Sequence, residues 1–164
     1  MMIRNIHERT VQAPAAQVGE LLDEVAIAGN PLWPTEKWPP LELDGPLGAG
    51  ANGGHGDVHY ACTAYRPGEF VEFTFAPGFL LEGTHTFEVI DDGVSTTLRH
   101  VIAAETRGIT GFLAWHLAIR PLHDALLEEL LDNAETAVGT PPTPFRWPLR
   151  TRVLFWISVK LGVD

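Results

Sequence analysis

Residues 83–104, GTHTFEVIDDGVSTTLRHVIAA, contain the pattern that decides the fold of this chain. The dipeptide Asp92-Gly93 separates two alternating apolar stretches, and it favours a two-residue hairpin turn because both turn positions need positive φ. Such a turn places His85 directly opposite His100. One face of the hairpin is then apolar apart from the two histidines, and its members are Val89, Phe87, Leu98, Ile102, His85 and His100. An apolar sheet face with few polar groups is typical of a small-molecule site.

Two strands on the amino-terminal side are expected to extend this face. Residues 55–65 and 69–75 are joined by Pro67-Gly68, which predicts a second hairpin. Its register pairs Tyr60 with Phe75, Cys62 with Phe73 and Ala64 with Val71. A three-residue turn at residues 77–79 then places Val71 opposite His85 in the next strand. The three turns agree on one apolar surface, because side chains alternate between the two faces of a strand.

Helices are expected on both sides of these strands. Pro14 begins the first helix, whose apolar stripe ends before Gly29. After Gly108 a longer apolar stripe predicts a helix over residues 110–137, and Pro121 is expected to kink or divide it. The remaining elements expected are a first strand at residues 3–11, a weak strand at residues 41–43 and a glycine-rich loop at residues 45–56.

Composition and charge limit the functions of the chain. Its 164 residues are 45% hydrophobic and 20% charged, which indicates one folded domain with a sizeable core. The net charge of −10 argues against nucleic-acid binding, which depends on neutralising phosphates. Cys62 is the single cysteine, so a disulfide framework and a cysteine-rich zinc site are excluded and a reducing, cytoplasmic location is expected. Neither a signal peptide nor a membrane-spanning apolar stretch is evident.

Four short motifs, taken in order along the chain, point to a family. They are APAAQV at residues 13–18, GTHTFEV at 83–89, LRH at 98–100 and RPLHDALLE at 120–128. With the order of the elements, they resemble the START/Bet v 1-like (SRPBCC) superfamily, and within it bacterial polyketide cyclase/dehydratase-like proteins. The resemblance covers residues 3–137. It implies an α+β helix-grip fold, in which a curved antiparallel β-sheet wraps around a long C-terminal α-helix and leaves an internal cavity. It also implies binding of hydrophobic or aromatic molecules, with cyclisation or dehydration in some members and no shared catalytic residue.

The cavity implied by this resemblance lies between the apolar sheet face and the last helix. Two interpretations of His85 and His100 stay open: they contact a ligand, or even act as acid or base, or they form a buried neutral pair. The leading function is binding, or transport, of a hydrophobic or aromatic small molecule; the alternative is a polyketide cyclase/dehydratase-type enzyme using a cavity histidine. The predicted ligand-binding residues are Tyr60, Val71, Phe73, Phe75, His85, Phe87, Leu98, His100, Ile102, Trp115 and Ile119.

Neither a metal nor a cofactor is expected. His55, Asp57 and His59 alternate along a predicted strand and share one face, a pattern that suits either zinc or a solvated strand edge. The solvated edge is favoured because no further cluster of ligands accompanies them.

A second polar group lies on the last predicted helix. His116, Arg120 and His123 share one side, with the two histidines too far apart along the axis to hold one metal ion. Arg120 is expected to form an ordinary surface ion pair with a neighbour such as Asp124. In the alternative interpretation, Arg120 guards the mouth of the cavity for an anionic ligand.

The last segment differs in composition from the rest. Residues 145–164 hold four basic residues and one acid, a charge of +3, whereas the preceding residues carry −13. We therefore expect a ligand-binding domain at residues 1–138, followed by a Pro-rich linker and a basic, apolar tail at residues 139–164. The tail is expected to pack on its own body or on a second subunit of a homodimer. Contact with a membrane surface is the less favoured alternative, because the apolar run is short.

Overall fold

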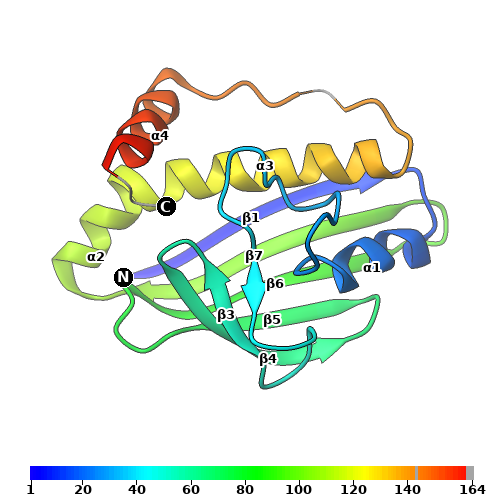
Figure 1. Cartoon of the computed structure of the whole chain (residues 1–164), viewed down its shortest axis with the longest axis horizontal. Coiled ribbons are helices and arrows are strands. Elements are labelled where there is room, and N and C mark those ends of the chain that lie inside the picture. The colour runs from blue at the N-terminus through cyan, green and yellow to red at the C-terminus, as the bar shows by residue number, and fades with distance from the viewer. Residues whose placement is uncertain (143, 162–164) are drawn as a thin grey trace.

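A seven-stranded antiparallel sheet forms the frame of the molecule, with the strand order β1-β7-β6-β5-β4-β3-β2 (Figure 1). The computed structural model describes residues 1–142 and 144–161. The strands are β1 Met2–Val11, β2 Glu42–Leu43, β3 Asn52–His55, β4 Val58–Arg66, β5 Phe70–Phe75, β6 Leu81–Asp91 and β7 Thr96–Thr106. The helices are α1 Ala15–Asp23, α2 Gly108–Ala114, the π-helix η1 Trp115–Ile119, α3 Arg120–Ala137 and α4 Leu149–Leu161. The helix α3 lies across one face of the curved sheet, which confirms the predicted helix-grip fold.

The core lies between α3 and the sheet. An apolar stripe of α3 faces the strands because its buried residues recur at helical spacing. These residues are Leu126, Leu127, Leu130, Leu131 and Ala134. They form one cluster with the sheet residues Val71, Phe73, Phe87 and Leu98, and the first helix adds Val18 and Leu22.

The β6–β7 hairpin keeps the predicted faces but not the predicted turn. Asp91 pairs with Thr96, so the loop is residues 92–95 and the two-residue turn was wrong. The carboxylate of Asp92 explains the longer loop, because it accepts hydrogen bonds from the backbone N–H groups of Val94 and Ser95. The register therefore moves by two positions, which leaves each side chain on its predicted face. His85 now pairs with Ile102, and His100 with Phe87.

The neighbouring registers are right in part. Tyr60 pairs with Phe75 and Cys62 with Phe73, as predicted. A bulge between Cys62 and Ala64 then shifts Ala64 opposite Glu72 instead of Val71. In the β5–β6 pair, Val71 lies opposite Phe87 and Phe73 opposite His85, two positions from the predicted register and again on the same face.

The glycine-rich segment contains a strand that the sequence did not predict. Residues 52–55 form β3, which pairs with β2 on one side and β4 on the other. Glycine allows the strands to approach here, because a Cβ atom at Gly53 would lie in contact with the carbonyl oxygen of Glu42. The expected strand over residues 55–65 therefore begins only at Val58, after a turn.

The last predicted helix is divided, as Pro121 indicated. The break is the π-helix η1, which ends just before Pro121. Proline has no N–H for the carbonyl one turn earlier, so the wider turn relieves the mismatch that a regular α-helix would have there.

The tail packs against its own chain. The backbone N–H of Phe145 donates a hydrogen bond to the carboxylate of Asp132 on α3. The ring of Trp38 packs against Trp147 at 5.6 Å and against Phe155 of α4 at 5.1 Å between centroids. The boundary between residues 138 and 139 stays a prediction. No helix in the described ranges is long and apolar enough to cross a bilayer.

Candidate functional site

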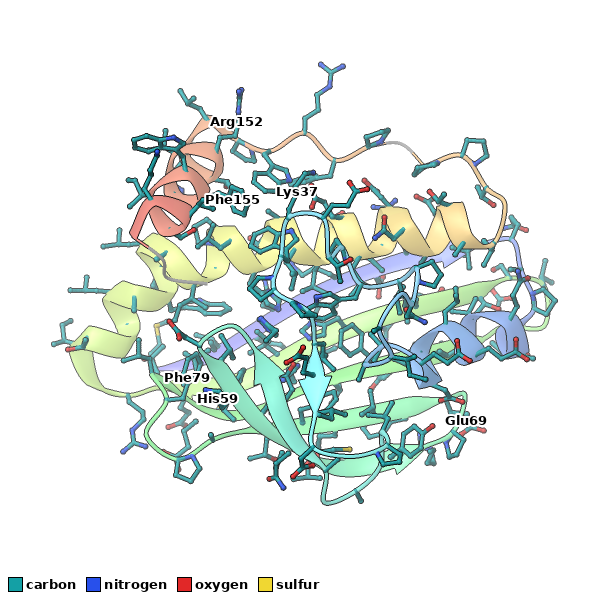
Figure 2. All side chains as sticks on the ribbon, viewed as in Figure 1. Lys37, His59, Glu69, Phe79, Arg152 and Phe155 are labelled. Atoms are coloured by element: carbon teal, nitrogen blue, oxygen red, sulfur yellow. The ribbon has the colours of Figure 1, made fainter. Side chains whose placement is uncertain are left out.

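A cavity of about 320 Å³ lies between the sheet, α3 and α4. Its walls come from several parts of the chain: the sheet, the loop at residues 33–39, the β3–β4 and β5–β6 turns, η1, α3 and α4. Figure 2 labels three of the lining residues, Lys37, Phe79 and Phe155, which come from the loop, the β5–β6 turn and α4. The volume falls at the lower end of the range found for small-molecule sites.

Three histidines lie close together in this largely apolar cavity wall, which also includes Lys37, His55, Asp57 and Ser158. His85, His100 and His123 all line the cavity and come from β6, β7 and α3. His100 Nε2 and His85 Nδ1 lie 3.4 Å apart, and the rings of His100 and His123 lie 5.0 Å apart. His85 and His100 are therefore diagonal neighbours on β6 and β7, not directly opposite each other, and their rings remain in contact.

Each of these histidines has a buried nitrogen that no described residue satisfies. The atoms are His85 Nε2, His100 Nδ1 and His123 Nδ1, and the buried hydroxyl of Tyr60 behind them is also without a partner. A buried polar atom that lacks a hydrogen bond is costly, and such atoms are rare in native proteins. Their concentration at one place makes this part of the wall the polar end of the cavity.

Burial keeps these imidazoles neutral. Desolvation lowers the pKa of His85 and of His100 well below the ordinary value, and lowers the pKa of His123 to about 3. His55, whose ring packs against Trp33 and Tyr60, has a pKa lowered to about 4 for the same reason. At neutral pH each ring therefore offers one hydrogen-bond donor and one acceptor.

The predicted site residues divide into two layers. Those that line the cavity are Phe75, His85, Phe87, His100, Ile102 and Ile119. The others are buried but are not among the lining residues: Tyr60, Val71, Phe73, Leu98 and Trp115. Val71, Phe73 and Leu98 are covered by the apolar stripe of α3, and Trp115 belongs to a second core cluster with Ile3 and Phe75. Contact of either layer with a ligand stays a prediction.

The His55–Asp57–His59 strand was wrong. His55 ends β3 and pairs with Val58, so His55 and His59 belong to different strands and do not share a face. His55 turns inward to line the cavity, whereas His59 stays exposed.

A charged network borders the cavity wall at the β1–α3 contact. His7 Nε2 lies 3.0 Å from Asp124 and His7 Nδ1 lies 2.8 Å from Glu128. Burial alone would lower the pKa of His7, but the hydrogen bonds to the two carboxylates outweigh it and raise the pKa. Arg120 pairs with Asp124 at 3.6 Å, which confirms the predicted surface ion pair.

This network contains the one group of described residues with the spacing of metal ligands. His7, His123 and Asp124 offer ligand atoms within 4.8 Å of one another. Both nitrogens of His7 already bind carboxylates, so the arrangement is that of an imidazolium between two anions.

Comparison with known proteins identifies the fold. No family model and no curated protein matches the chain by sequence. Among solved structures, CalU16 from Micromonospora echinospora is 14% identical with a TM-score of 0.59, over 98% of this chain and 89% of that chain. Norcoclaurine synthase from Thalictrum flavum is 13% identical with a TM-score of 0.63, over 85% and 95%. Ara h 8.0201 is 14% identical with a TM-score of 0.55, over 84% and 98%. The chain has the Bet v 1-like helix-grip fold. The solved structures thus confirm the helix-grip fold that the resemblance implied.

Several wall residues of this helix-grip protein were missing from the predicted set. His123 is one turn from Ile119 and three residues before Leu126, so the apolar stripe of α3 would have placed it inward. The tail residues Phe155, Ser158 and Val159 gave no such signal, because only the tertiary packing of α4 brings them to the cavity. The wall also includes Trp33, Trp38, Leu122 and Leu127.

Proposed function

We propose that the cavity binds a hydrophobic or aromatic small molecule with one polar end, which lies against His85, His100 and His123. The observation that carries this proposal is the group of neutral imidazoles with buried, unsatisfied nitrogens in a largely apolar wall. An apolar body would remove the wall from water, and a hydroxyl or carbonyl group would supply the missing hydrogen bonds. The ligand proposed is thus of the size and polarity of a phenol or a small aromatic ketone.

The cavity can be tested by filling it. We expect Ile119→Trp to lower the affinity for the fluorescent probe 1-aminoanthracene by about tenfold or more, because the larger ring occupies ligand space. Leu117→Trp is the matched control, since Leu117 lies two residues earlier in η1 and is 61% exposed. Equal binding by both variants and the unchanged protein would show that the probe binds elsewhere.

The polar end can be tested by comparing 2-naphthol with naphthalene, which lacks the hydroxyl. The unchanged protein should prefer 2-naphthol, because the histidines bind its hydroxyl group. Replacing both His85 and His100 by Phe leaves neither partner of the pair behind and should reduce that preference by about tenfold. A preference that survives the double replacement would contradict the proposed role of the pair.

An acid or base role for the pair is a second candidate function, favoured by the position of both imidazoles in the cavity wall, 3.4 Å apart. A neutral imidazole nitrogen can accept a proton from a bound substrate, as a polyketide cyclase/dehydratase-type reaction requires. One structural neighbour is norcoclaurine synthase in complex with a transition-state analogue, and another is DynU16 from the dynemicin biosynthetic locus. With polyketide-like substrates, the double Phe replacement should abolish turnover while binding of 1-aminoanthracene continues. Turnover that survives the replacement would exclude this role.

Homodimerisation and a cytoplasmic location stay predictions of the sequence. The fold is compatible with a dimer, since a structural neighbour is the Aha1 dimer from Colwellia psychrerythraea, with a TM-score of 0.53.

A further inference from the structure

The outer side of α4 carries an apolar stripe that no described residue covers. Leu149, Val153 and Trp156 follow at the helical spacing i, i+4, i+7, with exposed fractions of 74%, 49% and 61%. Lys160 continues the stripe, and its ammonium lies 5.8 Å from the centre of the Trp156 ring. Phe155, in contrast, belongs to the inner side that packs on the body.

Basic residues flank this stripe in the sequence. Glu129 of α3, which binds Lys37, lies in the same surface hollow as Arg146, Arg152 and Trp156. Residues 145–161 hold four basic residues and no acidic one, and residues 107–123 hold two and none. The rest of the chain has five basic residues against all 21 acidic residues. Positive charge is therefore concentrated in residues 145–161 of a strongly acidic protein, because Arg120 of the other segment is paired with Asp124.

Both segments lie beside the cavity. Ile119 of η1 and Val159 of α4 line it, so α4, which carries most of this positive charge, also forms part of the cavity wall. Figure 2 shows Arg152 pointing away from the body and Phe155 pointing toward it. On the other segment, Leu113 is 47% exposed and Leu117 is 61% exposed. We use the name basic-apolar surface for these exposed residues: Leu113, Leu117, Arg146, Leu149, Arg150, Arg152, Val153, Trp156 and Lys160.

We propose that the basic-apolar surface docks onto the surface of an anionic lipid bilayer. Exposed Trp and aliphatic side chains enter the boundary between headgroups and acyl chains, while Arg and Lys bind the anionic headgroups. The 13 residues of α4 extend about 20 Å, less than the hydrocarbon thickness, so the helix lies in the plane of the interface. Docking places one wall of the cavity against the membrane, where apolar molecules are concentrated. The inference does not depend on what the cavity binds.

A second copy of the chain is the competing partner for the same surface, because its acidic body would also attract positive charge. The bilayer is favoured by the mixture of residues. Trp with flanking Arg and Lys is typical of membrane interfaces. The cores of protein–protein interfaces, in contrast, are depleted of lysine and of charged residues in general.

Vesicle flotation tests the proposal with the full chain. We expect the protein to float with vesicles of phosphatidylcholine containing 30% phosphatidylglycerol, much less with phosphatidylcholine alone, and to be released by 0.5 M NaCl. Replacing Arg150 and Arg152 by Gln should lower the partition coefficient about tenfold, since each charge contributes several-fold. Replacing Val153 and Trp156 by Ser should also weaken vesicle binding, even at high lipid concentration. The replacement removes the apolar side chains that insert into the bilayer.

Matched replacements elsewhere control for charge and for exposed apolar area. Arg4→Gln with Arg66→Gln removes the same charge from exposed strand positions. Val94→Ser with Ile27→Ser removes side chains that are 87% and 60% exposed and lie outside the basic-apolar surface. Both control proteins should bind vesicles like the unchanged chain, and circular dichroism should show all variants folded.

Three results would overturn the proposal. The first is equal flotation with and without phosphatidylglycerol, and the second is an equal loss of binding in the control variants. The third is a dimer in light scattering that the basic-apolar replacements convert to a monomer, together with no vesicle binding by any variant. That third result would assign the surface to a second copy of the chain.

Discussion

At the scale of single residues, His7 links the first strand to the last long helix. Both its nitrogens bind carboxylates of α3, and the neighbouring Arg9 extends the network to Glu128, Asp132 and Glu135. Because the folded state raises the pKa of His7, the folded protein holds this proton more tightly than the unfolded chain does. The stabilisation is therefore complete below the unfolded pKa near 6.5 and is lost as pH rises through the folded pKa.

His7→Gln should destabilise the protein by about 2 kcal/mol at pH 6, because it removes the cation between two part-buried carboxylates. The difference from the unchanged protein should narrow at pH 9, because His7 loses its proton as the pH rises through its folded pKa. Urea unfolding at the two pH values measures both free energies. The control is His59→Gln, which changes an exposed histidine outside this network. A penalty for His7→Gln that is equal at the two pH values would contradict the charged state assigned to His7.

The sequence located His85 and His100 correctly but not their neighbours. Alternation within a hairpin is local, so it places both histidines on the apolar face even when the register moves by two positions. His7 of β1 binds Asp124 of α3, which lies 117 residues later in the sequence. No short-range pattern reports such a contact, so the position of His7 beside His123 became visible only in the structure.

At the scale of elements, α1 is fixed to the β4–β5 turn by close backbone approach. A Cβ atom at Gly19 would lie 2.5 Å from the carbonyl oxygen of Gly68. The N–H of Gly68 donates a hydrogen bond of 2.7 Å to the carboxylate of Asp23, at the end of the same helix. Only glycine at position 19 permits this contact.

Gly19→Ala should therefore destabilise the protein by roughly 1–3 kcal/mol, the usual cost of overpacking. The sign of this change in stability is informative, because Gly→Ala inside an exposed helix stabilises the helix by about 1 kcal/mol. Thermal unfolding measures the effect. Gly45→Ala serves as the control, since a Cβ there meets no atom within 4 Å. An unchanged or raised midpoint for Gly19→Ala would show that α1 does not pack as described.

The predicted elements were right where the hydrophobic periodicity was strong. The predictions were wrong where glycines or the hydrogen bonds of a turn determined the structure. The stripe of α3 and the break at Pro121 have clear local causes. The strand β3 contains two glycines, which have low strand propensity and take their place only because β2 and β4 approach closely. The β6–β7 loop depended on hydrogen bonds from Asp92, which compete with the turn that Asp-Gly favours.

At the scale of the whole molecule, two buried and two half-buried histidines make stability depend on pH. His55, His85, His100 and His123 have lowered pKa values because burial disfavours the charged ring. The unfolded chain binds protons near pH 6.5 and the folded chain does not, so stability falls as pH drops below about 6.5. His7 has the opposite effect on the pH dependence of stability, but it is one residue and the histidines with lowered pKa values are four.

The free energy of unfolding should therefore fall by several kcal/mol between pH 7 and pH 5, at about 2 kcal/mol for each buried histidine. His123→Leu removes one of them and breaks no hydrogen bond that its side chain forms with a described residue. The loss between the two pH values should shrink by about 2 kcal/mol in that variant. Urea titrations at pH 7, 6 and 5 would reveal this. A flat profile for the unchanged protein would mean that the histidines are accessible to protons in the folded state.

Native mass spectrometry of the full chain tests most directly whether the cavity binds a small molecule. The protein would be incubated with a mixture of small aromatic phenols and ketones, desalted and measured beside Ile119→Trp and Leu117→Trp. We predict one bound molecule per chain in the unchanged protein and in Leu117→Trp, and none in Ile119→Trp, whose added ring fills the space between η1 and the histidines. Identical ligand-free masses for all three proteins, or equal retention of ligand by Ile119→Trp, would contradict the account.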